Sequence, residues 1–426
     1  MPGNLCEIMS KRGLMEWCSN AEELGAKMES EMVTGYVGFD PSADSLHVGN
    51  MVPIMGLAWL QRSGHKPISL AGGGTGLIGD PSGKTKERQL LSVDLVAHNM
   101  ECIKKQLSRF LDFDCGENSA IMPNNHDWLT KISFIEFLRD TGKYFPVNTL
   151  INREYIRSRI DDPDRGITYT EMSYILLQAY DFCHMFETMN CSLQMGGNDQ
   201  QGNIIGGIDL IRRKTGGRAY GLTFQLLLTA AGTKFGKSEE GAVYLDPEKT
   251  SPYKFYQFWI NADDRDIERL HKIYSFADLE DIAELTARHA SHPEKREAQK
   301  ALAWDMTVRV HGEDKAARAR DASAVLFGER DVRSADETLL DTLAAEIPTC
   351  DIASPLPIPV IEGLVASGGV AGKGEGRRKI REGGVYLNGE RVSDETKTIA
   401  QADLLPGGYA QIRVGKKDFR LIRFNR

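Results

Sequence analysis

Apolar and polar runs alternate along the first half of the chain in a way that predicts strands and helices in turn. An apolar run at 32–39 is followed by a turn-rich stretch and by a helical pattern at about 50–62. Further strands are predicted at 67–71, 194–195 and 221–228. Strand–helix alternation of this kind is typical of a parallel α/β sheet, so we predict a Rossmann-like first domain.

The pattern changes on either side of this alternation. Residues 1–30 have apolar positions at helical spacing, first at Leu5, Ile8 and Met9 and later at Leu24 and Met28, so we predict helix there. Residues 251–347 are charged, low in glycine and rich in helix formers. Prolines then mark a linker, and Asn388-Gly389 predicts a β-hairpin in the last part of the chain. We therefore predict four parts: an α/β domain at 1–248 with an inserted connecting segment at about 115–165, an α-helical domain at 249–347, a linker at 348–358 and a small α+β domain at 359–426.

Charge separates the last part from the rest. The chain has 426 residues and a net charge of −8, but residues 372–426 carry 13 Lys and Arg against 7 Asp and Glu, a net of +6. The remaining residues therefore carry −14. The split favours one of two interpretations. The basic C-terminal part binds a polyanion and is attached to an acidic remainder, or it is simply a lysine-rich surface that faces solvent. The seven cysteines lack metal-type spacing, which predicts free thiols in a reducing cytoplasm. We also predict no membrane span and no signal peptide, because no apolar run is long enough for either.

A predicted helix at 170–187 is apolar on every side except for one polar stripe. Thr168 and Glu171 have the spacing of an N-terminal capping box. Tyr174, Gln178 and Asp181 follow at i, i+4 and i+7 and so share one face. A buried carboxylate and amide need partners, because unpaired burial costs several kcal/mol. The stripe predicts either a structural hydrogen-bond network, a solvent-facing stripe or a site for a small polar ligand.

Two segments far apart in the chain carry cations beside glycines. His47-Val48-Gly49 lies where a strand leads into a helix, and Lys234–Ser238 holds two lysines around Gly236. Each segment alone is weak evidence for a function, since His47 could be an ordinary residue at a helix start and the lysines could belong to a solvated loop. Together, with a nucleotide-sized α/β domain between them, they predict a clamp for a triphosphate.

Two further glycine-rich segments have competing explanations. Residues 79–85 are similar to a phosphate-binding P-loop, but position 78 is Ile where that motif needs Gly, and Pro81 removes a backbone donor. We reject a P-loop and keep Lys84 and Arg88 as candidate phosphate cations. In 196–203, Asp199 can accept from ribose hydroxyls or simply cap a helix.

Five of these motifs, in this order, closely resemble bacterial tyrosyl-tRNA synthetases: 36–50, 79–84, 174–181, 196–203 and 234–238. The resemblance extends over essentially the whole chain, and residues 355–426 are similar to the S4-type RNA-binding module. It implies a class I synthetase that activates L-tyrosine with ATP, releasing pyrophosphate, and then charges tRNA(Tyr). The resemblance makes 1–248 the catalytic domain and 249–347 the tRNA anticodon-binding domain, and it makes 41–50 and 234–238 the first and second signature segments. It also implies Mg²⁺ arriving with ATP, no fixed protein metal site, a homodimer, a cytoplasmic location and no membrane association.

The resemblance also implies a role for each matching residue. The catalytic group is His47, Asn50, Lys84, Arg88, Lys234, Lys237 and Ser238. The tyrosine-binding group is Tyr36 and Asp181 at the phenol, Asp80, Tyr174 and Gln178 at the ammonium, and Gln200 near the carboxylate. The ATP-binding group is Gly38, Asp40, His47, Gly49, Gly197, Asp199 and Lys237.

Three positions depart from the family pattern. Asn50 stands where the first signature ends in a second histidine, and it cannot carry charge. Gln201 stands where the family usually has Trp, and Val37 replaces a residue that is polar in some members. We expect these changes to tune ATP affinity and to leave the reaction unchanged.

Three alternatives stay open on the sequence. A tryptophanyl-tRNA synthetase has the same fold, but Tyr36 with Asp181 suits a phenol better than an indole. A non-catalytic RNA-binding protein of this fold is opposed by intact His47 and the signature lysines, and an adenylating enzyme without tRNA is opposed by the basic C-terminal part. An apolar set in the connecting segment is either a dimer interface or core: Phe134, Phe137, Leu138, Tyr144 and Phe145.

Overall fold

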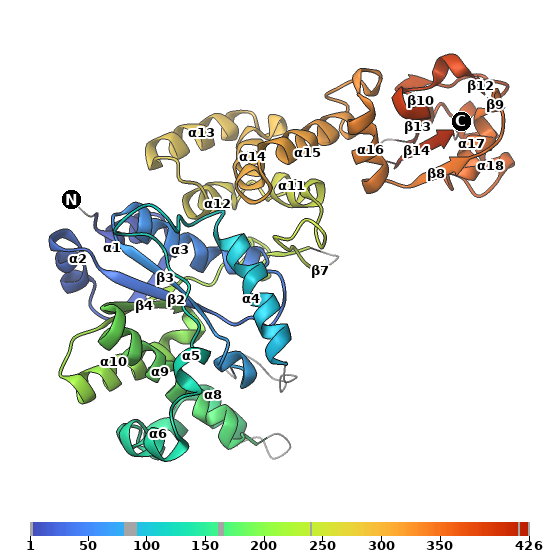
Figure 1. Ribbon diagram of the computed structural model, residues 1–426. Helices are drawn as coiled ribbons and strands as arrows, with labels where there is room; N and C mark the ends of the chain where they lie inside the picture. The colour runs from blue at the N-terminus through green and yellow to red at the C-terminus, as the bar shows by residue number, and fades with distance from the viewer. Residues whose placement is uncertain (1–2, 81–91, 161–165, 239–240, 416–417, 425–426) are drawn as a thin grey trace. The chain divides into compact units, whose positions relative to one another are not determined.

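The chain forms two compact units in a computed structural model, which describes residues 3–80, 92–160, 166–238, 241–415 and 418–424. The first unit comprises Met1–Lys249 and Ala262–Leu302. The second comprises Thr250–Asn261 and Ala303–Arg426. The chain therefore crosses between the two units more than once (Figure 1).

A five-stranded sheet forms the centre of the first unit. Its order is β1-β5-β4-β2-β3. All neighbouring strands are parallel except β1, which pairs antiparallel with β5 at one edge. The bounds are Met15–Cys18 for β1, Thr34–Phe39 for β2, Lys66–Ala71 for β3, Cys191–Gly197 for β4 and Tyr220–Phe224 for β5. The predicted parallel α/β sheet is thus confirmed.

The N-terminal prediction of continuous helix is wrong in its middle. Residues 1–30 contain helix α1 (Leu5–Lys11), strand β1 and helix α2 (Ala21–Ser30). Asn4 and Asn20 cap the two helices by accepting from Glu7 N and Glu23 N. The four-residue β1 is too short to show a period of its own, and its partner β5 lies some 200 residues later, so only tertiary pairing defines it.

Helices cover both faces of this sheet (Figure 1). Helix α3 (Met51–Arg62) packs on one face, where Gly56 allows close contact with the ring of Phe224. Helices α9 (Tyr169–Met189) and α10 (Gln201–Thr215) pack on the other, where Gly221 lies against Ile204 of α10. Phe224 and Gly221 are three residues apart on β5, so they face opposite sides of the sheet.

The remaining elements are mostly helical. In the first unit they are α4 (Val93–Leu107), α5 (His126–Leu129), α6 (Phe134–Asp140), α7 (Val147–Ile151), α8 (Glu154–Ile160), α12 (Ile267–Tyr274), α13 (Leu279–Ser291) and the hairpin β6 (Lys237–Ser238)–β7 (Gly241–Ala242). Helix α14 (Glu297–His311) begins in the first unit and continues into the second, which also holds α11 (Pro252–Ile260), α15 (Glu313–Leu326) and α16 (Glu337–Glu346). Among the described residues, no helix is long and apolar enough to cross a membrane.

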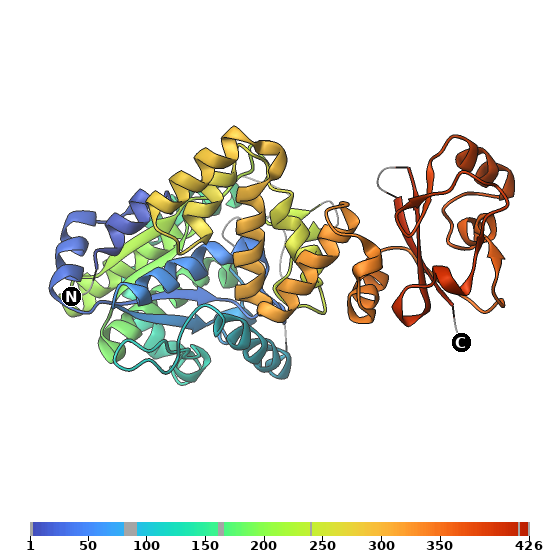
Figure 2. The same ribbon diagram turned by 90° about the horizontal axis from the view of Figure 1, so that it is seen from above.

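A second five-stranded sheet forms the C-terminal part of the second unit. Its order is β11-β10-β13-β14-β8, with helices α17 (Val360–Ala366) and α18 (Lys373–Arg381) on one side (Figure 2). Ile361 and Ile380 of these helices share a buried cluster with Ile412 and Ile422 of the sheet. The strands are β10 (Val385–Leu387), β11 (Glu390–Arg391), β13 (Tyr409–Val414), β14 (Asp418–Phe424) and β8 (Thr349–Ile352), beside a separate pair β9 (Ile358–Pro359) and β12 (Thr398–Ile399).

Two local predictions in this part have different outcomes. The hairpin at Asn388-Gly389 is confirmed, since both residues have positive φ (48° and 84°) between β10 and β11. The proline-rich stretch 348–358, however, is more than a linker, because it contains β8. Thr349 pairs in parallel with Leu421 of β14, so this strand closes one edge of the sheet. The other boundaries predicted for the domains stay predictions.

The apolar set of the connecting segment divides into two groups. Phe134 is 63% exposed, and Leu138 on the same helix is also exposed. Phe137, Tyr144 and Phe145 are instead partly buried against clusters that include residues of α9. The second group therefore belongs to the core, and only the first presents apolar surface.

Candidate active site

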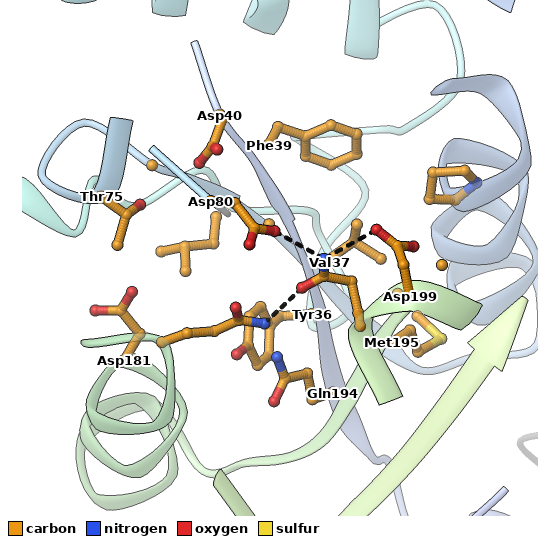
Figure 3. A pocket seen from close by; sticks show the side chains of 18 of the residues that line it. Tyr36, Val37, Phe39, Asp40, Thr75, Asp80, Asp181, Gln194, Met195 and Asp199 are labelled. Carbon is orange, nitrogen blue, oxygen red and sulfur yellow. Dashed lines mark hydrogen bonds between the residues drawn. The ribbon is translucent and has the colours of Figure 1, made fainter. Parts of the chain in front are cut away.

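A cavity of about 250 Å³ opens at the carboxyl ends of β2 and β4 (Figure 3). These strands are neighbours, and the sheet continues from β2 to β3 on one side and from β4 to β5 on the other. Such a switch in strand order leaves a crevice between the loops that follow the strands, which is where open α/β sheets bind ligands. The cavity thus lies where the topology alone predicts a site.

Asp181 forms the buried polar end of this cavity. Its side chain is 1% exposed and accepts hydrogen bonds from Asn125 Nδ2 at 2.8 Å and from Trp128 Nε1 at 2.7 Å. Burial raises the pKa of Asp181 to about 7, although both hydrogen bonds act in the opposite direction. Asn125 is itself held by Thr75 Oγ1, which accepts from its Nδ2, and by the backbone N–H of Gly74. The direction of the carboxylate is therefore fixed by two donors, one of which is itself held by Thr75 and Gly74.

Tyr36 lies on β2 beside the same end of the cavity (Figure 3). Its ring packs against Phe182 with 5.4 Å between centroids, and its Oη is buried with no hydrogen-bond partner among the described residues. Burial and the nearby Asp181 raise the pKa of Tyr36, so its hydroxyl keeps its proton. A protonated hydroxyl and a carboxylate offer one donor and one acceptor, which is the complement of a phenol.

Gln200 is the centre of a hydrogen-bond network at the wider part of the cavity. It accepts from Gln178 Nε2 at 3.1 Å and donates to Asp80 Oδ2 at 2.8 Å and Asp199 Oδ2 at 3.2 Å. Asn203 adds a bond to Gln178 Oε1 at 2.9 Å. The network joins α9, the start of α10 and the loop after β3, so the polar stripe of α9 faces a cavity and not bulk solvent (Figure 3).

Most of the predicted substrate-binding residues therefore line one cavity. They are Tyr36, Gly38, Asp40, Asp80, Tyr174, Gln178, Asp181, Gly197, Asp199 and Gln200. Val37 also lines it, and Gln201 begins α10 just beyond it.

The first signature segment leads from the end of β2 into α3. His47 is half-buried, and its ring lies 6.4 Å from that of Tyr244. Asn50 Oδ1 accepts from the backbone N–H of His47 at 3.1 Å, so the residue that departs from the family pattern closes the turn. Helix α4 holds the segment from outside, because Asn99 Nδ2 donates to Pro41 O and Gln106 Oε1 accepts from Leu46 N.

The second signature segment lies against the first. A Cβ added at Gly236 would be 2.7 Å from the backbone nitrogen of Gly49, and Gly236 has a φ of +98°. Only glycine is compatible with both. Lys234 is exposed, and Lys237 and Ser238 form β6. Lys84 and Arg88 lie outside the described residues.

Several residues of the site were not found from the sequence. Asn125 and Trp128 hold Asp181 from a region of short helices, and Gln194 on β4 lines the cavity with an Oε1 that has no partner among the described residues. Asn99 and Gln106 act from α4. The one available signal was a polar residue at an otherwise apolar position, as at Gln194 within β4.

Comparison with known proteins agrees with this geometry. Residues 28–328 match the family of class I tRNA synthetases for tryptophan and tyrosine, and 340–422 match the C-terminal domain of SYY-like tyrosine–tRNA ligases. The tyrosine–tRNA ligase of Anaeromyxobacter dehalogenans is 48% identical over 99% of both chains, and tyrosine–tRNA ligase 1 of Bacillus subtilis is 44% identical over 99% of both. A truncated mitochondrial tyrosyl-tRNA synthetase of Aspergillus nidulans has a TM-score of 0.68 at 28% identity, covering 76% of this chain and 94% of that one.

The fold, the cavity at the strand switch and the paired signature segments define a class I aminoacyl-tRNA synthetase of the tryptophan and tyrosine group. Both parts of the chain match, and the relatives align over nearly its full length. The chain belongs to the tyrosine–tRNA ligase family.

Proposed function

We propose that this protein activates L-tyrosine with ATP to form tyrosyl-adenylate and pyrophosphate, and then transfers the tyrosyl group to the 3′-terminal adenosine of tRNA(Tyr). The observation that carries the proposal is the pairing of Tyr36 with Asp181 at the buried end of the cavity. The full-length similarity to tyrosine–tRNA ligases supports the same substrate.

The phenol of the substrate accounts for both buried groups. Tyr36 Oη donates to the phenol oxygen, and the phenol O–H donates to Asp181. Phenylalanine would leave both Tyr36 Oη and Asp181 without that partner in a buried site, and an unsatisfied buried polar group costs free energy. The cavity therefore selects for a hydroxyl as well as for a ring.

The network at the wider part of the cavity suits the reacting end of the amino acid. Asp80, Tyr174 and Gln178 bind the ammonium group, and Gln200 lies beside the carboxylate. Asp80 is restrained by its bond from Gln200, so the ammonium and carboxylate sites are coupled. Holding the carboxylate in position for attack on the α-phosphorus lowers the entropic part of the barrier.

The nucleotide occupies the loops after the strands and the two signature segments. Gly38, Asp40, Gly197 and Asp199 line the adenosine and ribose. His47, Gly49 and Lys237 are the other ATP contacts. The negative charge that develops on the phosphates in the transition state is stabilised by the candidate catalytic residues. They are His47, Asn50, Lys84, Arg88, Lys234, Lys237 and Ser238. The tyrosine carboxylate attacks the α-phosphorus as the bond to pyrophosphate breaks, so the site needs placed cations more than a base. Mg²⁺ enters with ATP and neutralises charge on its phosphates.

The basic C-terminal part binds the tRNA that receives the tyrosyl group. We place the protein in the cytoplasm as a homodimer, with Phe134, Ile135 and Leu138 of α6 as the contact surface. These three side chains are exposed, and α6 carries no fully buried residue, so the helix gains burial from a partner.

Amino-acid-dependent exchange of pyrophosphate into ATP tests the proposal. Tyrosine should support exchange, whereas tryptophan and phenylalanine at the same concentration should not. Exchange with tryptophan alone would identify the other specificity of the family, and no exchange with any amino acid would contradict an activating enzyme. Charging of tRNA(Tyr) by the same preparation then tests the second step.

A further inference from the structure

The carboxylate of Asp181 is hydrogen-bonded to one member of an aromatic stack. The indole of Trp128 donates its Nε1 hydrogen to Asp181 Oδ1. The face of the same indole stacks on the imidazole of His184, with 4.5 Å between centroids and 25° between planes. His184 follows Asp181 by three residues on α9, so both contacts of the indole come from one helix face.

The support of Trp128 depends on its neighbours. Its own helix, α5, has only four residues, too few to fix a large side chain by backbone order alone. Trp128 is nevertheless 8% exposed, so its ring is held by side chains around it. His184 covers one face of the ring, and offset or parallel stacking of this kind contributes free energy beyond simple burial.

The imidazole is held in turn by its surroundings. Tyr180 lies one turn before it on α9, with 6.2 Å between centroids and 20° between planes. Lys214 Nζ lies 5.8 Å from the Tyr180 ring and pairs with Glu187 at 3.1 Å. Burial lowers the pKa of His184, Lys214 acts in the same direction, and Glu187 opposes them. The ring that stacks on Trp128 at neutral pH is therefore the neutral imidazole.

We propose that His184 is a positioning residue for tyrosine recognition: by stacking on Trp128 it fixes the indole plane, and the indole N–H fixes Asp181 for the substrate phenol. His184 itself lines no part of the cavity. The inference rests on the proposed role of Asp181, and it assigns selectivity to a side chain outside the substrate-binding shell.

The test compares H184A, H184L and H184F with the wild type in tyrosine-dependent pyrophosphate exchange. H184A should raise KM for tyrosine about three- to tenfold, as expected for loss of one aromatic pair, with KM for ATP unchanged. The ratio of kcat/KM for tyrosine over phenylalanine should fall by the same factor. H184F, which restores a flat ring, should recover most of the loss, and H184L should not. H292A, which removes an exposed histidine whose imidazole lies 3.5 Å from Glu294 and not near Trp128, is the matched control.

The outcomes separate this inference from the proposed function. If H184A and H184L leave KM for tyrosine and the selectivity ratio unchanged while D181N raises KM, the positioning role is wrong and the function stands. An equal rise in KM for ATP, or no recovery in H184F, would indicate general loss of structure and also overturn the inference. If the wild type shows no tyrosine-dependent exchange, the proposed function itself fails. Should H184A not fold, H184L against H184F gives the same comparison.

Discussion

The carboxylate of Asp181 is buried and both of its oxygens are also hydrogen-bonded, two properties that are difficult to combine in a protein interior. It is removed from water, which raises its pKa, yet two fixed donors keep both of its oxygens satisfied. These donors leave the carboxylate as an oriented acceptor for one further hydrogen. In the proposed function, selectivity for a hydroxyl therefore depends on Asn125 and Trp128 as much as on the carboxylate itself.

Replacing Asp181 with Asn tests this at the scale of one residue. The amide keeps the size of the side chain but loses the charge, so we expect KM for tyrosine to rise about 10- to 100-fold, the range for a hydrogen bond to a charged group. KM for ATP should stay within twofold. D209N, at an exposed ion pair on α10, is the control, and an unchanged KM for tyrosine in D181N would rule out the phenol as its partner.

The residues of the polar stripe show what could be anticipated at this scale. Helical spacing alone placed Tyr174, Gln178 and Asp181 on one face, because that spacing is a local property. The sequence left a structural network, a solvent-facing stripe and a ligand site as alternatives, and the stripe forms a network that lines a cavity. The partners Asn125 and Trp128 could not be found in this way, since they lie 56 and 53 residues away, at the short helix α5.

At the scale of elements, helix α12 anchors the loop that carries the second signature. Asp266, just before α12, accepts from the backbone N–H of Ala230 at 2.7 Å, and Arg269 donates to Leu228 O and to Asp266. Near the end of the helix, Tyr274 stacks on Phe235 with 6.0 Å between ring centroids. The base of the loop is therefore held at several points, and its tip meets Gly49.

Removing the Arg269 contact should affect the nucleotide and spare the amino acid. We expect R269A to lower kcat for pyrophosphate exchange and raise KM for ATP, each about three- to tenfold, because one charge-assisted bond to a loop carbonyl is lost. KM for tyrosine should not change. R265A removes a neighbouring arginine whose pair with Asp263 is exposed, so it should behave as wild type. A rise confined to KM for tyrosine would show that the loop has another role.

Element predictions from the sequence succeeded where the signal was local and strong. The long helix α9, with its Thr168–Glu171 capping box, and the Asn388-Gly389 hairpin formed as expected. The strands β1 and β8 were missed because each is four residues long and is defined by pairing with a distant strand. The contacts of α12 with the signature loop likewise join residues some 36 to 41 positions apart.

At the scale of the whole molecule, the charge split separates two tasks. The cavity lies in the acidic part of the chain, before residue 372. Helix α18, which packs on the C-terminal sheet, carries the exposed arginines Arg377, Arg378 and Arg381. This module is also joined to the helices before it by a shared core in which Leu405, Tyr409 and Leu421 pack against Leu339 and Leu343. Deleting it from about residue 350 would expose that core, so charge changes are the cleaner experiment.

Reversing the three arginines of α18 to glutamate should separate activation from charging. We expect pyrophosphate exchange to be unchanged, while KM for tRNA(Tyr) rises at least tenfold and its dependence on salt becomes weaker, because fewer phosphate contacts release fewer counterions. K11E, at an exposed pair on α1, is the control. Unchanged charging in the triple variant would show that this helix does not bind the tRNA.

The raised pKa of Asp181 makes tyrosine binding a proton-linked equilibrium. With its pKa at about 7, the side chain in the empty cavity is a mixture of acid and carboxylate near neutral pH. In the proposed complex Tyr36 donates to the phenol oxygen, so the phenol donates to Asp181, which favours the carboxylate and lowers its pKa on binding. Binding should thus release part of a proton at pH 7, and affinity should fall as pH drops below about 7. Calorimetry in phosphate and in Tris would give different apparent enthalpies for the wild type and equal ones for D181N, after correction for any other proton-linked group.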